Sequence, residues 1–346
     1  MKVGIVGYTG SGKSTIFGAL TGTDAGIPGG ARETRLGTIR VPDARVDSLA
    51  GIFSPKKTTY AEVIFADLPG VPRTQSGGLD KDTVEQLKKL DALALVVRDF
   101  EGFGDAADPA RDAEDFGVEL VLSDQILVDR RIERMRKEGK KGEREFALFE
   151  QMLSHLEDGK PLRTLGLQPA DLNVLSGYQF ASLTPLLIVM NTAEDADGDA
   201  AVAKVASVAD EAGAVALALS GQLELEIADL DPEERGAFLA DLGLESPASD
   251  RFIQKAYELL DLISFLTAGP DECRAWTITR GTNAQRAAGK IHSDLERGFI
   301  RAEVYCVADL EEHGTEAALK PAGKLRVEGK NYTVQDGDVM NIRFNV

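Results

Sequence analysis

Residues 1–20 read MKVGIVGYTGSGKSTIFGAL, and this stretch decides the fold. Residues 2–6 are mostly apolar and rich in β-forming side chains. A glycine-rich loop follows at once, and then a helix-like run from Lys13 to Leu20. Residues 7–14 match the pattern G-x-x-x-x-G-K-[ST], which in this strand–loop–helix context is a phosphate-binding loop. The sequence therefore predicts a nucleoside triphosphate site at the start of an α/β domain.

The residues of this loop have predicted roles. Glycines let successive backbone N–H groups point at phosphates, and the N-terminus of the following helix adds partial positive charge. Lys13 is predicted to bridge the β- and γ-phosphates, and the Ser14 hydroxyl is predicted to ligate Mg²⁺. The predicted nucleotide-binding residues of this segment are Gly7, Tyr8, Thr9, Gly10, Ser11, Gly12, Lys13, Ser14 and Thr15.

A second motif, Asp67-Leu68-Pro69-Gly70, follows an expected strand at residues 62–66. Asp67 is predicted to hold Mg²⁺ through water, and the Gly70 N–H to sense the γ-phosphate, so Lys13 and Gly70 are the candidate catalytic groups. The next residue, Val71, stands where Ras-like enzymes place a glutamine that positions water. Because valine cannot orient water, hydrolysis should rest on Lys13, Mg²⁺ and the loop amides, and intrinsic turnover should be slow.

The segment Asn191-Thr192-Ala193-Glu194 follows an expected strand at residues 186–190. Guanine-specific proteins carry N-K-x-D here, because an aspartate accepts both N–H donors of guanine. In this chain Glu194 is one methylene longer and Thr192 replaces the lysine, so ATP is predicted in preference to GTP. Ser220 and Gly221, after the expected strand 215–219, should close over the base. A GTP-preferring enzyme and a nucleotide-binding module with negligible hydrolysis remain the alternatives.

The rest of the chain suggests three domains. Between residues 118 and 180, long charged helices interrupt the βαβ rhythm, with Leu122, Ile126, Ile132 and Met135 as an apolar face. A helix is expected over residues 251–266 before a boundary at Gly269-Pro270. The expected strands of the two sheets are residues 2–6, 38–41, 62–66, 92–97, 186–190 and 215–219, then 275–279, 301–306, 332–334 and 339–344. We therefore expect a nucleotide-binding domain (1–117 with 181–271), an inserted helical hairpin (118–180) and a small C-terminal domain (272–346).

Charge and hydropathy limit the kinds of partner that the protein can have. The 346 residues carry a formal net charge of −18, and apolar stretches are too short for a membrane helix. We expect a cytoplasmic protein with neither a membrane nor a specific DNA sequence as partner. The segment from Arg130 to Arg144 instead holds 8 basic and 3 acidic residues, so the predicted hairpin tip can dock on a polyanion. An ordinary solvated helix surface is the alternative interpretation.

These elements together resemble the Obg-like ATPase (YchF) family, of which the chain is identified as a diverged member. Matching segments include GTIRVPDARVD at 37–47, and at the C-terminus AAGKIHSDLERGFIRA at 287–302 and GKLRVEGKNYTVQDGDVMNIRFNV at 323–346. The resemblance implies a TRAFAC-class G domain, a helical hairpin and a C-terminal TGS domain of β-grasp type. It also implies ATP in preference to GTP, and association with ribosomes or ribosomal RNA through the hairpin and the TGS domain.

The sequence departs from the family pattern near the phosphates. Gly10 replaces an asparagine associated with a monovalent cation. The first switch segment, residues 26–36, offers only Thr34 as a γ-phosphate sensor and metal ligand. Residues 101–112 contain no histidine, whereas relatives carry one proposed to assist hydrolysis. The helical insert is also short. These departures again predict slow intrinsic hydrolysis, with a partner as the candidate activator.

Overall fold

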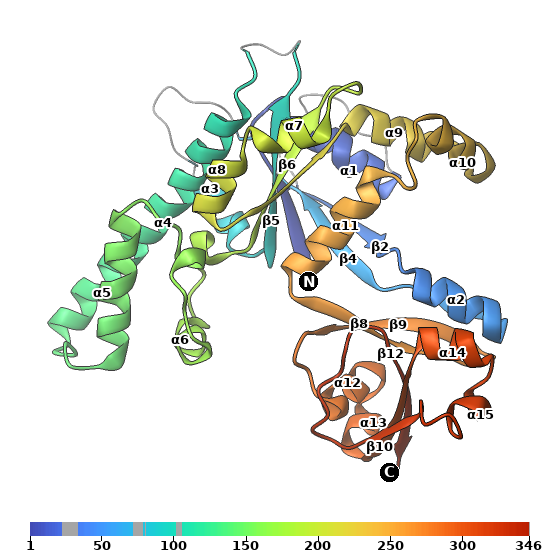
Figure 1. Cartoon of the computed structure of the whole chain (residues 1–346). Coiled ribbons are helices and arrows are strands. Elements are labelled where there is room, and N and C mark those ends of the chain that lie inside the picture. The colour runs from blue at the N-terminus through green and yellow to red at the C-terminus, as the bar shows by residue number, and fades with distance from the viewer. Residues whose placement is uncertain (23–33, 72–78, 80, 102–105, 346) are drawn as a thin grey trace. The chain divides into compact units, whose positions relative to one another are not determined.

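The computed structural model describes residues 1–22, 34–71, 79, 81–101 and 106–345 (Figure 1). The chain divides into two compact units, residues 1–38 with 64–252, and residues 39–63 with 253–346. No helix in the described part of the chain is both long enough and apolar enough to cross a membrane. The three-domain division predicted from the sequence stays a prediction.

The first unit is built around a six-stranded sheet in the order β2-β4-β1-β5-β6-β7. Its strands are β1 (Lys2–Val6), β2 (Arg35–Arg40), β4 (Glu62–Asp67), β5 (Ala92–Asp99), β6 (Leu186–Thr192) and β7 (Val215–Leu219). β1 pairs in parallel with β4 on one side and with β5 on the other. The strand order therefore changes direction beside β1, and ligands bind at such switch points, outside the carboxyl ends of the strands.

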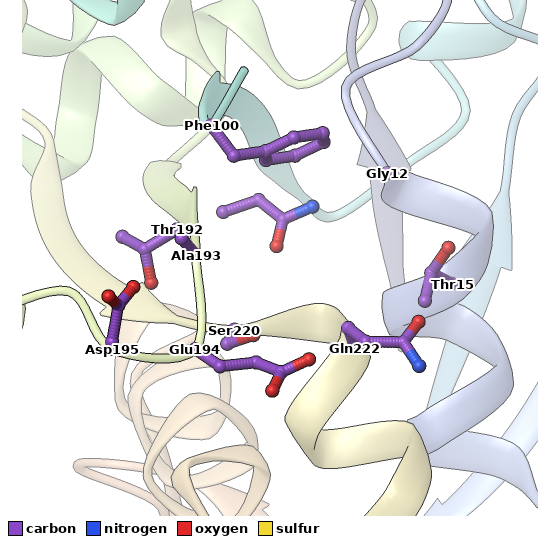
Figure 2. A pocket seen from close by; sticks show the side chains of 10 residues that line it. Gly12, Thr15, Phe100, Thr192, Ala193, Glu194, Asp195, Ser220 and Gln222 are labelled. Carbon is purple, nitrogen blue, oxygen red and sulfur yellow. The ribbon is translucent and has the colours of Figure 1, made fainter. Parts of the chain in front are cut away.

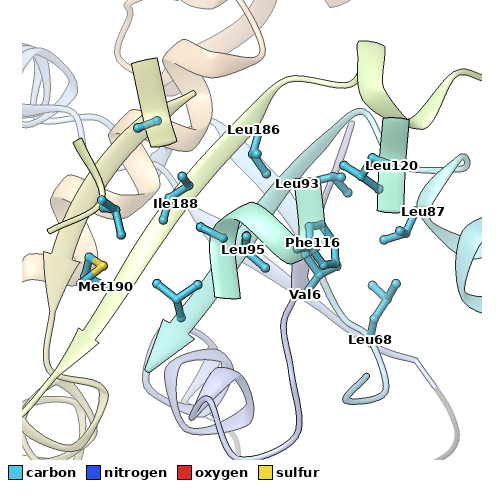
Figure 3. Close-up of a cluster of buried hydrophobic side chains, with 14 of the residues drawn as sticks. Val6, Leu68, Leu87, Leu93, Leu95, Phe116, Leu120, Leu186, Ile188 and Met190 are labelled. Atoms are coloured by element: carbon cyan, nitrogen blue, oxygen red, sulfur yellow. The ribbon is translucent and has the colours of Figure 1, made fainter. Parts of the chain in front are cut away.

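Helices alternate with these strands along the chain. Those of the first unit include α1 (Lys13–Thr21), α3 (Lys81–Leu87), α7 (Gly198–Ala203), α8 (Ala206–Ala212), α9 (Gly221–Asp229) and α10 (Pro232–Asp241), while α11 (Ala248–Leu259) belongs to the first unit only up to Phe252. Figure 3 shows one core cluster, in which Leu93 and Leu95 of β5 and Ile188 of β6 lie near Phe116 of α4 (Pro109–Lys137), the helix that follows β5. β6 is buried along its whole length, as expected of a parallel strand covered on both faces.

Two helices lie in the part of the chain where the sequence predicts an insert, α4 (Pro109–Lys137) and α5 (Arg144–Glu157), followed by the short elements η1 (Leu162–Thr164), α6 (Pro169–Leu175) and η2 (Ala181–Leu183). α4 and α5 share an apolar core that includes Ile132 and Met135. The prediction for the apolar face of α4 was wrong at Leu122 and Ile126, which are 47% and 52% exposed. The buried face instead runs through Leu120, Asp124 and Val128, and an aspartate at its centre conceals the pattern.

Asp124 is fully buried, and it joins α4 to the chain before β6. Its carboxylate accepts hydrogen bonds from the backbone N–H groups of Ala181 (2.9 Å) and Ser182 (2.7 Å) and from the Ser182 hydroxyl (2.6 Å). The carboxylate therefore supplies the hydrogen-bond acceptors for these two backbone N–H groups, because each buried N–H needs a partner.

We predict that Asp124→Ala lowers the free energy of unfolding by about 2–4 kcal/mol, because two buried N–H groups lose their acceptor. Urea denaturation followed by circular dichroism measures this loss. Asp129→Ala is the matched control, since Asp129 lies on the same helix and is exposed. Equal midpoints for the two variants would contradict the role assigned to Asp124.

The second unit contains a six-stranded sheet in the order β11-β10-β12-β8-β9-β3. Its strands are β3 (Lys57–Thr59), β8 (Leu262–Thr267), β9 (Glu272–Thr279), β10 (Phe299–Cys306), β11 (Arg326–Glu328) and β12 (Asp338–Phe344). Its helices are α2 (Ala44–Phe53), α12 (Ala284–Ile291), α13 (Ser293–Arg297), α14 (Val307–His313) and α15 (Glu316–Leu319). A core that includes Phe265, Ala287 and Val304 lies between the sheet and α12.

Two predictions for this unit were wrong. The helix expected at residues 251–266 ends at Leu259, and β8 follows it, because the apolar run after Asp261 pairs with β9 and β12. The strand expected at residues 332–334 does not form. Val334 is buried and donates its N–H to the Thr282 carbonyl, while β11 at residues 326–328 pairs with β10.

Candidate functional site

The loop between β1 and α1 has the geometry of a phosphate-binding loop. Gly12, the residue before α1, has φ +84°, and a Cβ atom there would lie 2.0 Å from Nδ2 of Asn191. Only glycine meets both conditions, because other residues are strained at this φ and the amide blocks a side chain. The loop thus packs directly against the end of β6, so it lies beside the segment 191–194 that is predicted to read the base.

The predicted metal ligands Ser14 and Asp67 lie together. The Ser14 hydroxyl donates to Oδ2 of Asp67 over 3.1 Å, and Asp67 is 5% exposed at the end of β4. Among the described residues, Oδ1 of Asp67 and the Ser11 hydroxyl are buried without a hydrogen-bond partner. A buried carboxylate oxygen beside a hydroxyl suits Mg²⁺, a hard cation that prefers oxygen ligands. These residues therefore fit a magnesium ion and its phosphates.

The two candidate catalytic residues also meet. A Cβ atom built at Gly70 would lie 3.2 Å from Nζ of Lys13, so the Gly70 backbone and the lysine border the same space. The Val71 backbone fixes this approach, because its carbonyl accepts from Thr9 N–H (2.9 Å) and its N–H donates to the Gly7 carbonyl (3.1 Å). The Val71 side chain is buried and has no hydrogen-bonding group, so it cannot orient a water molecule.

Burial lowers the pKa of the Lys13 ammonium below its ordinary value; the Asp67 carboxylate opposes this shift, and the Arg35 guanidinium adds to it. A partly desolvated cation interacts strongly with an anion, because the local dielectric constant is lower than that of water. The position and the environment of Lys13 therefore both suit a phosphate ligand.

A pocket of about 600 Å³ lies beside the loop (Figure 2). It is lined by Gly12, Thr15, Phe100, Asn191, Thr192, Ala193, Glu194, Asp195, Ser220 and Gln222. Figure 2 shows the Phe100 ring on the side of the pocket opposite Glu194 and Gln222. A hollow of this volume, with one aromatic wall and a few polar groups, is typical of small-molecule sites.

Asn191 organises this pocket. Its Nδ2 donates to the Ser11 carbonyl, and its Oδ1 accepts from the Gly221 N–H, both over 2.9 Å. The asparagine therefore ties the phosphate loop to β6 and to the start of α9. Ser220 stabilises the same corner, because its hydroxyl accepts from Leu223 N–H and so caps α9. Glu194 is left exposed at the pocket edge, where its carboxylate can accept hydrogen bonds from a base.

Thr34, another predicted site residue, contacts α3. Its hydroxyl donates to Oε1 of Gln86 in that helix, over 3.3 Å at the surface. Its role as metal ligand and γ-phosphate sensor stays a prediction, and residues 26–33 of the same predicted segment lie outside the described residues. The loop expected to matter at residues 101–112 is described only in part.

Sequence reasoning missed three residues that line the pocket, Phe100, Asp195 and Gln222. Phe100 follows β5, Asp195 follows β6, and Gln222 comes after β7. Because the carboxyl ends of parallel strands converge at one edge of the sheet, the positions just after each expected strand were the available signal. Sequence reasoning also missed Arg35, which pairs with Asp67.

Comparison with known proteins agrees with this geometry. A family model described as "50S ribosome-binding GTPase" matches residues 2–140, and the model YchF-GTPase_C, described as "Protein of unknown function (DUF933)", matches residues 262–345. The "Ribosome-binding ATPase YchF" of Haemophilus ducreyi is 38% identical over 360 aligned residues, covering 100% of this chain and 99% of that protein. This chain belongs to the YchF family.

Other YchF relatives are similar over the whole length. The protein of the same name from Bacillus subtilis is 36% identical, with 100% of both chains covered, and "Obg-like ATPase 1" of Oryza sativa subsp. japonica is 35% identical, covering 92% of that protein. The solved structure of the Schizosaccharomyces pombe YchF GTPase matches with a TM-score of 0.85 and 27% identity over 99% of this chain and 97% of that one. The resemblance and the α/β fold class inferred from the sequence are confirmed.

Proposed function

We propose that this chain is a nucleotide-dependent switch protein that binds ATP with Mg²⁺, hydrolyses it slowly and associates with the ribosome. The observation that carries the nucleotide part is the single continuous site in which Asn191 joins the phosphate loop to a base pocket. Curated relatives named ribosome-binding ATPases support the same activity and partner. A partner of this kind would place the protein in the cytoplasm.

Different residues of this chain would bind the phosphates, hold the metal and contact the terminal phosphate during phosphoryl transfer. Backbone N–H groups of the loop and the Lys13 ammonium bind the phosphates, while Ser14 and Asp67 hold the metal, as their contact and the orphaned Asp67 oxygen indicate. Bound there, Mg²⁺ would neutralise phosphate charge. The Gly70 backbone lies beside Lys13, where its N–H would donate to the terminal phosphate. With Val71 unable to orient water, catalysis rests on electrostatic stabilisation and is slow.

The preference for ATP over GTP would be set by Glu194 and Thr192 at the edge of the pocket. The exposed Glu194 carboxylate accepts hydrogen bonds and suits the amino group of adenine, whereas the two adjacent N–H donors of guanine suit the shorter aspartate. Thr192 is too short to cover the base as a lysine would. Both features support ATP over GTP, while Asn191 is already committed to Ser11 and Gly221.

Calorimetric titration of ATP and of GTP, each with Mg²⁺, into nucleotide-free protein tests this proposal. Tighter binding of ATP is expected, and multiple-turnover phosphate release should then show slow hydrolysis. Tighter binding of GTP would overturn the assigned base preference. Binding of ATP without phosphate release in a single turnover would favour the second candidate, a nucleotide-binding module, for which the buried Val71 is the supporting observation.

The tip of the helical hairpin is the proposed ribosome contact, together with the C-terminal unit. Five of the eight basic residues from Arg130 to Arg144 form ion pairs, for example Arg131 with Glu145 and Arg144 with Asp171. Among the described residues, Lys137 and Lys141 are exposed with no acidic partner within 4 Å. Unneutralised cations on a protruding turn are suited to contact phosphates.

We predict that the double variant Lys137→Glu with Lys141→Glu binds ribosomes about tenfold more weakly and lowers the salt dependence of binding by about two ions, because two phosphate contacts are lost. Co-sedimentation at several salt concentrations measures both quantities. The double variant Lys2→Glu with Lys89→Glu, which reverses two exposed lysines elsewhere, is the control. If both variants weaken binding equally, the tip is not the contact.

A further inference from the structure

The Asp67 carboxylate has a second partner, Arg35, the first residue of β2. Nη2 of Arg35 lies 2.5 Å from Oδ2 of Asp67, and its Nε lies 3.1 Å from the same oxygen. The Ser14 hydroxyl also donates to this oxygen, over 3.1 Å. Three donors therefore meet at the carboxylate oxygen that lies next to Ser14, the other proposed metal ligand.

This ion pair lies in the part of the site that contains Lys13 and Ser14, where the phosphates and the metal are expected to bind. The Asp67 side chain is 6% exposed and that of Arg35 is 31% exposed, so the pair is better shielded than an ordinary surface pair. The guanidinium also lies over the Phe17 ring of α1, 5.1 Å from its centroid. Its charge acts on Lys13, whose pKa it helps to lower. Arg35 is thus placed among the residues that bind metal and phosphate.

A guanidinium and a divalent cation cannot share this carboxylate at low cost. Oδ2 already accepts three donors, and a metal ion at the unpartnered Oδ1 would still lie within a few ångströms of the guanidinium. Two positive charges a few ångströms apart also repel each other, and most strongly where water is excluded. Occupation of Asp67 by Arg35 and its occupation by Mg²⁺ are therefore competing states.

We propose that Arg35 is a built-in competitor of Mg²⁺: it neutralises Asp67 in the metal-free state and leaves it when the metal binds. The inference rests on the proposed function, since it concerns the same magnesium-nucleotide site. Arg35 is a positioning residue here, because it acts through the Asp67 carboxylate. By neutralising Asp67, it reduces the electrostatic repulsion between this carboxylate and phosphate in the metal-free site. Mg²⁺ must then break the Arg35–Asp67 ion pair in order to bind.

Removal of the guanidinium has two effects that act in the same direction. Without Arg35, the bare Asp67 carboxylate repels a metal-free nucleotide, so binding in EDTA becomes weaker. The metal meanwhile binds without having to displace a partner, so magnesium strengthens nucleotide binding more. The ratio of the nucleotide Kd in EDTA to the Kd in Mg²⁺ therefore rises when Arg35 is lost.

The ratio is measured by calorimetric titration of ADP, which avoids hydrolysis, into the full chain with EDTA or with Mg²⁺. Arg35→Met should raise it about tenfold relative to wild type, since a charge-assisted hydrogen bond of this kind is lost. Arg35→Lys, which keeps the charge, should raise it less. Arg40→Met, at an exposed arginine on the same strand, is the control and should leave it unchanged. An unchanged ratio in Arg35→Met would overturn the proposal.

Two further measurements separate this inference from the proposed function. In an Asp67→Asn background, Arg35→Met should have no added effect on the ratio, because the carboxylate through which it acts is gone. In the nucleotide-free protein, Mn²⁺ titration followed by electron paramagnetic resonance should show tighter binding to Arg35→Met than to wild type. Equal Mn²⁺ binding would contradict the role of Arg35 even if the nucleotide measurements succeed. Wild-type protein that binds no nucleotide would overturn the proposed function, and the Mn²⁺ titration would then decide the Arg35 inference alone.

Discussion

Replacing Lys13 with methionine should reduce ATP hydrolysis by at least about a hundredfold while the protein stays folded. The ammonium group borders the same space as the Gly70 backbone and lies near Asp67, where the terminal phosphates would bind. Methionine has a similar length but no charge, so the developing negative charge on the phosphates loses its main protein cation. Folding should not suffer, because burial already disfavours the charged form of Lys13.

The rate is measured as phosphate release in the steady state, with circular dichroism to confirm the fold. Lys89→Met is the matched control, since Lys89 is exposed after α3 and should leave the rate unchanged. Hydrolysis by Lys13→Met within about threefold of wild type would be a loss of less than 1 kcal/mol of transition-state stabilisation. Such a result would show that the phosphates bind elsewhere, and it would remove the basis of the proposed mechanism.

The second large effect concerns the base. The double variant Glu194→Asp with Thr192→Lys should shift the preference between ATP and GTP by at least about tenfold toward GTP. The shorter aspartate can accept both N–H donors of guanine, and the lysine stem can cover the base. Asn191 needs no change, because it bonds Ser11 and Gly221 rather than the base.

Calorimetric titration of both nucleotides with Mg²⁺ measures the preference as a ratio of Kd values. Asp199→Asn, at an exposed carboxylate of α7 close in sequence to Glu194, is the control, because it changes the net charge by the same +1 as the double variant. A double variant that keeps the wild-type ratio would show that other groups in the pocket, such as Phe100 or Gln222, read the base.

The phosphate site was predictable because its signals are local. The spacing of the glycines, Lys13 and Ser14 specifies a strand–loop–helix turn within a few residues. Asp67 and Gly70 follow an apolar strand, and parallel strands bring their carboxyl ends to one edge of a sheet, so the approach of Asp67 to Ser14 could be expected as well. The base segment at Asn191 followed from the same rule.

Other parts of the site and the fold were not predictable, because their partners lie far along the chain. Asp124 occupies a core position of α4 that a hydrophobic pattern rejects, and only the N–H groups of Ala181 and Ser182, 57 and 58 residues away, make it suitable there. Arg35 looks like any charged residue at the start of a strand until Asp67 lies beside it. The run at β8 reads equally well as the end of a helix, because short apolar runs do not distinguish helix from strand.

The α/β sheet of buried parallel strands could be predicted from the sequence alone, and so could the positions of the loop at residues 7–14 and of Asp67, because each depends on neighbours within a few residues or on hydrophobic periodicity. Only the tertiary structure decided that residues 39–63 fold with the C-terminal unit. There β3 pairs in parallel with β9, and Arg45 of α2 forms an ion pair with Asp336, 291 residues away in the chain. Strand pairing and ion pairs of this kind depend on which surfaces meet in space, and no local pattern records that.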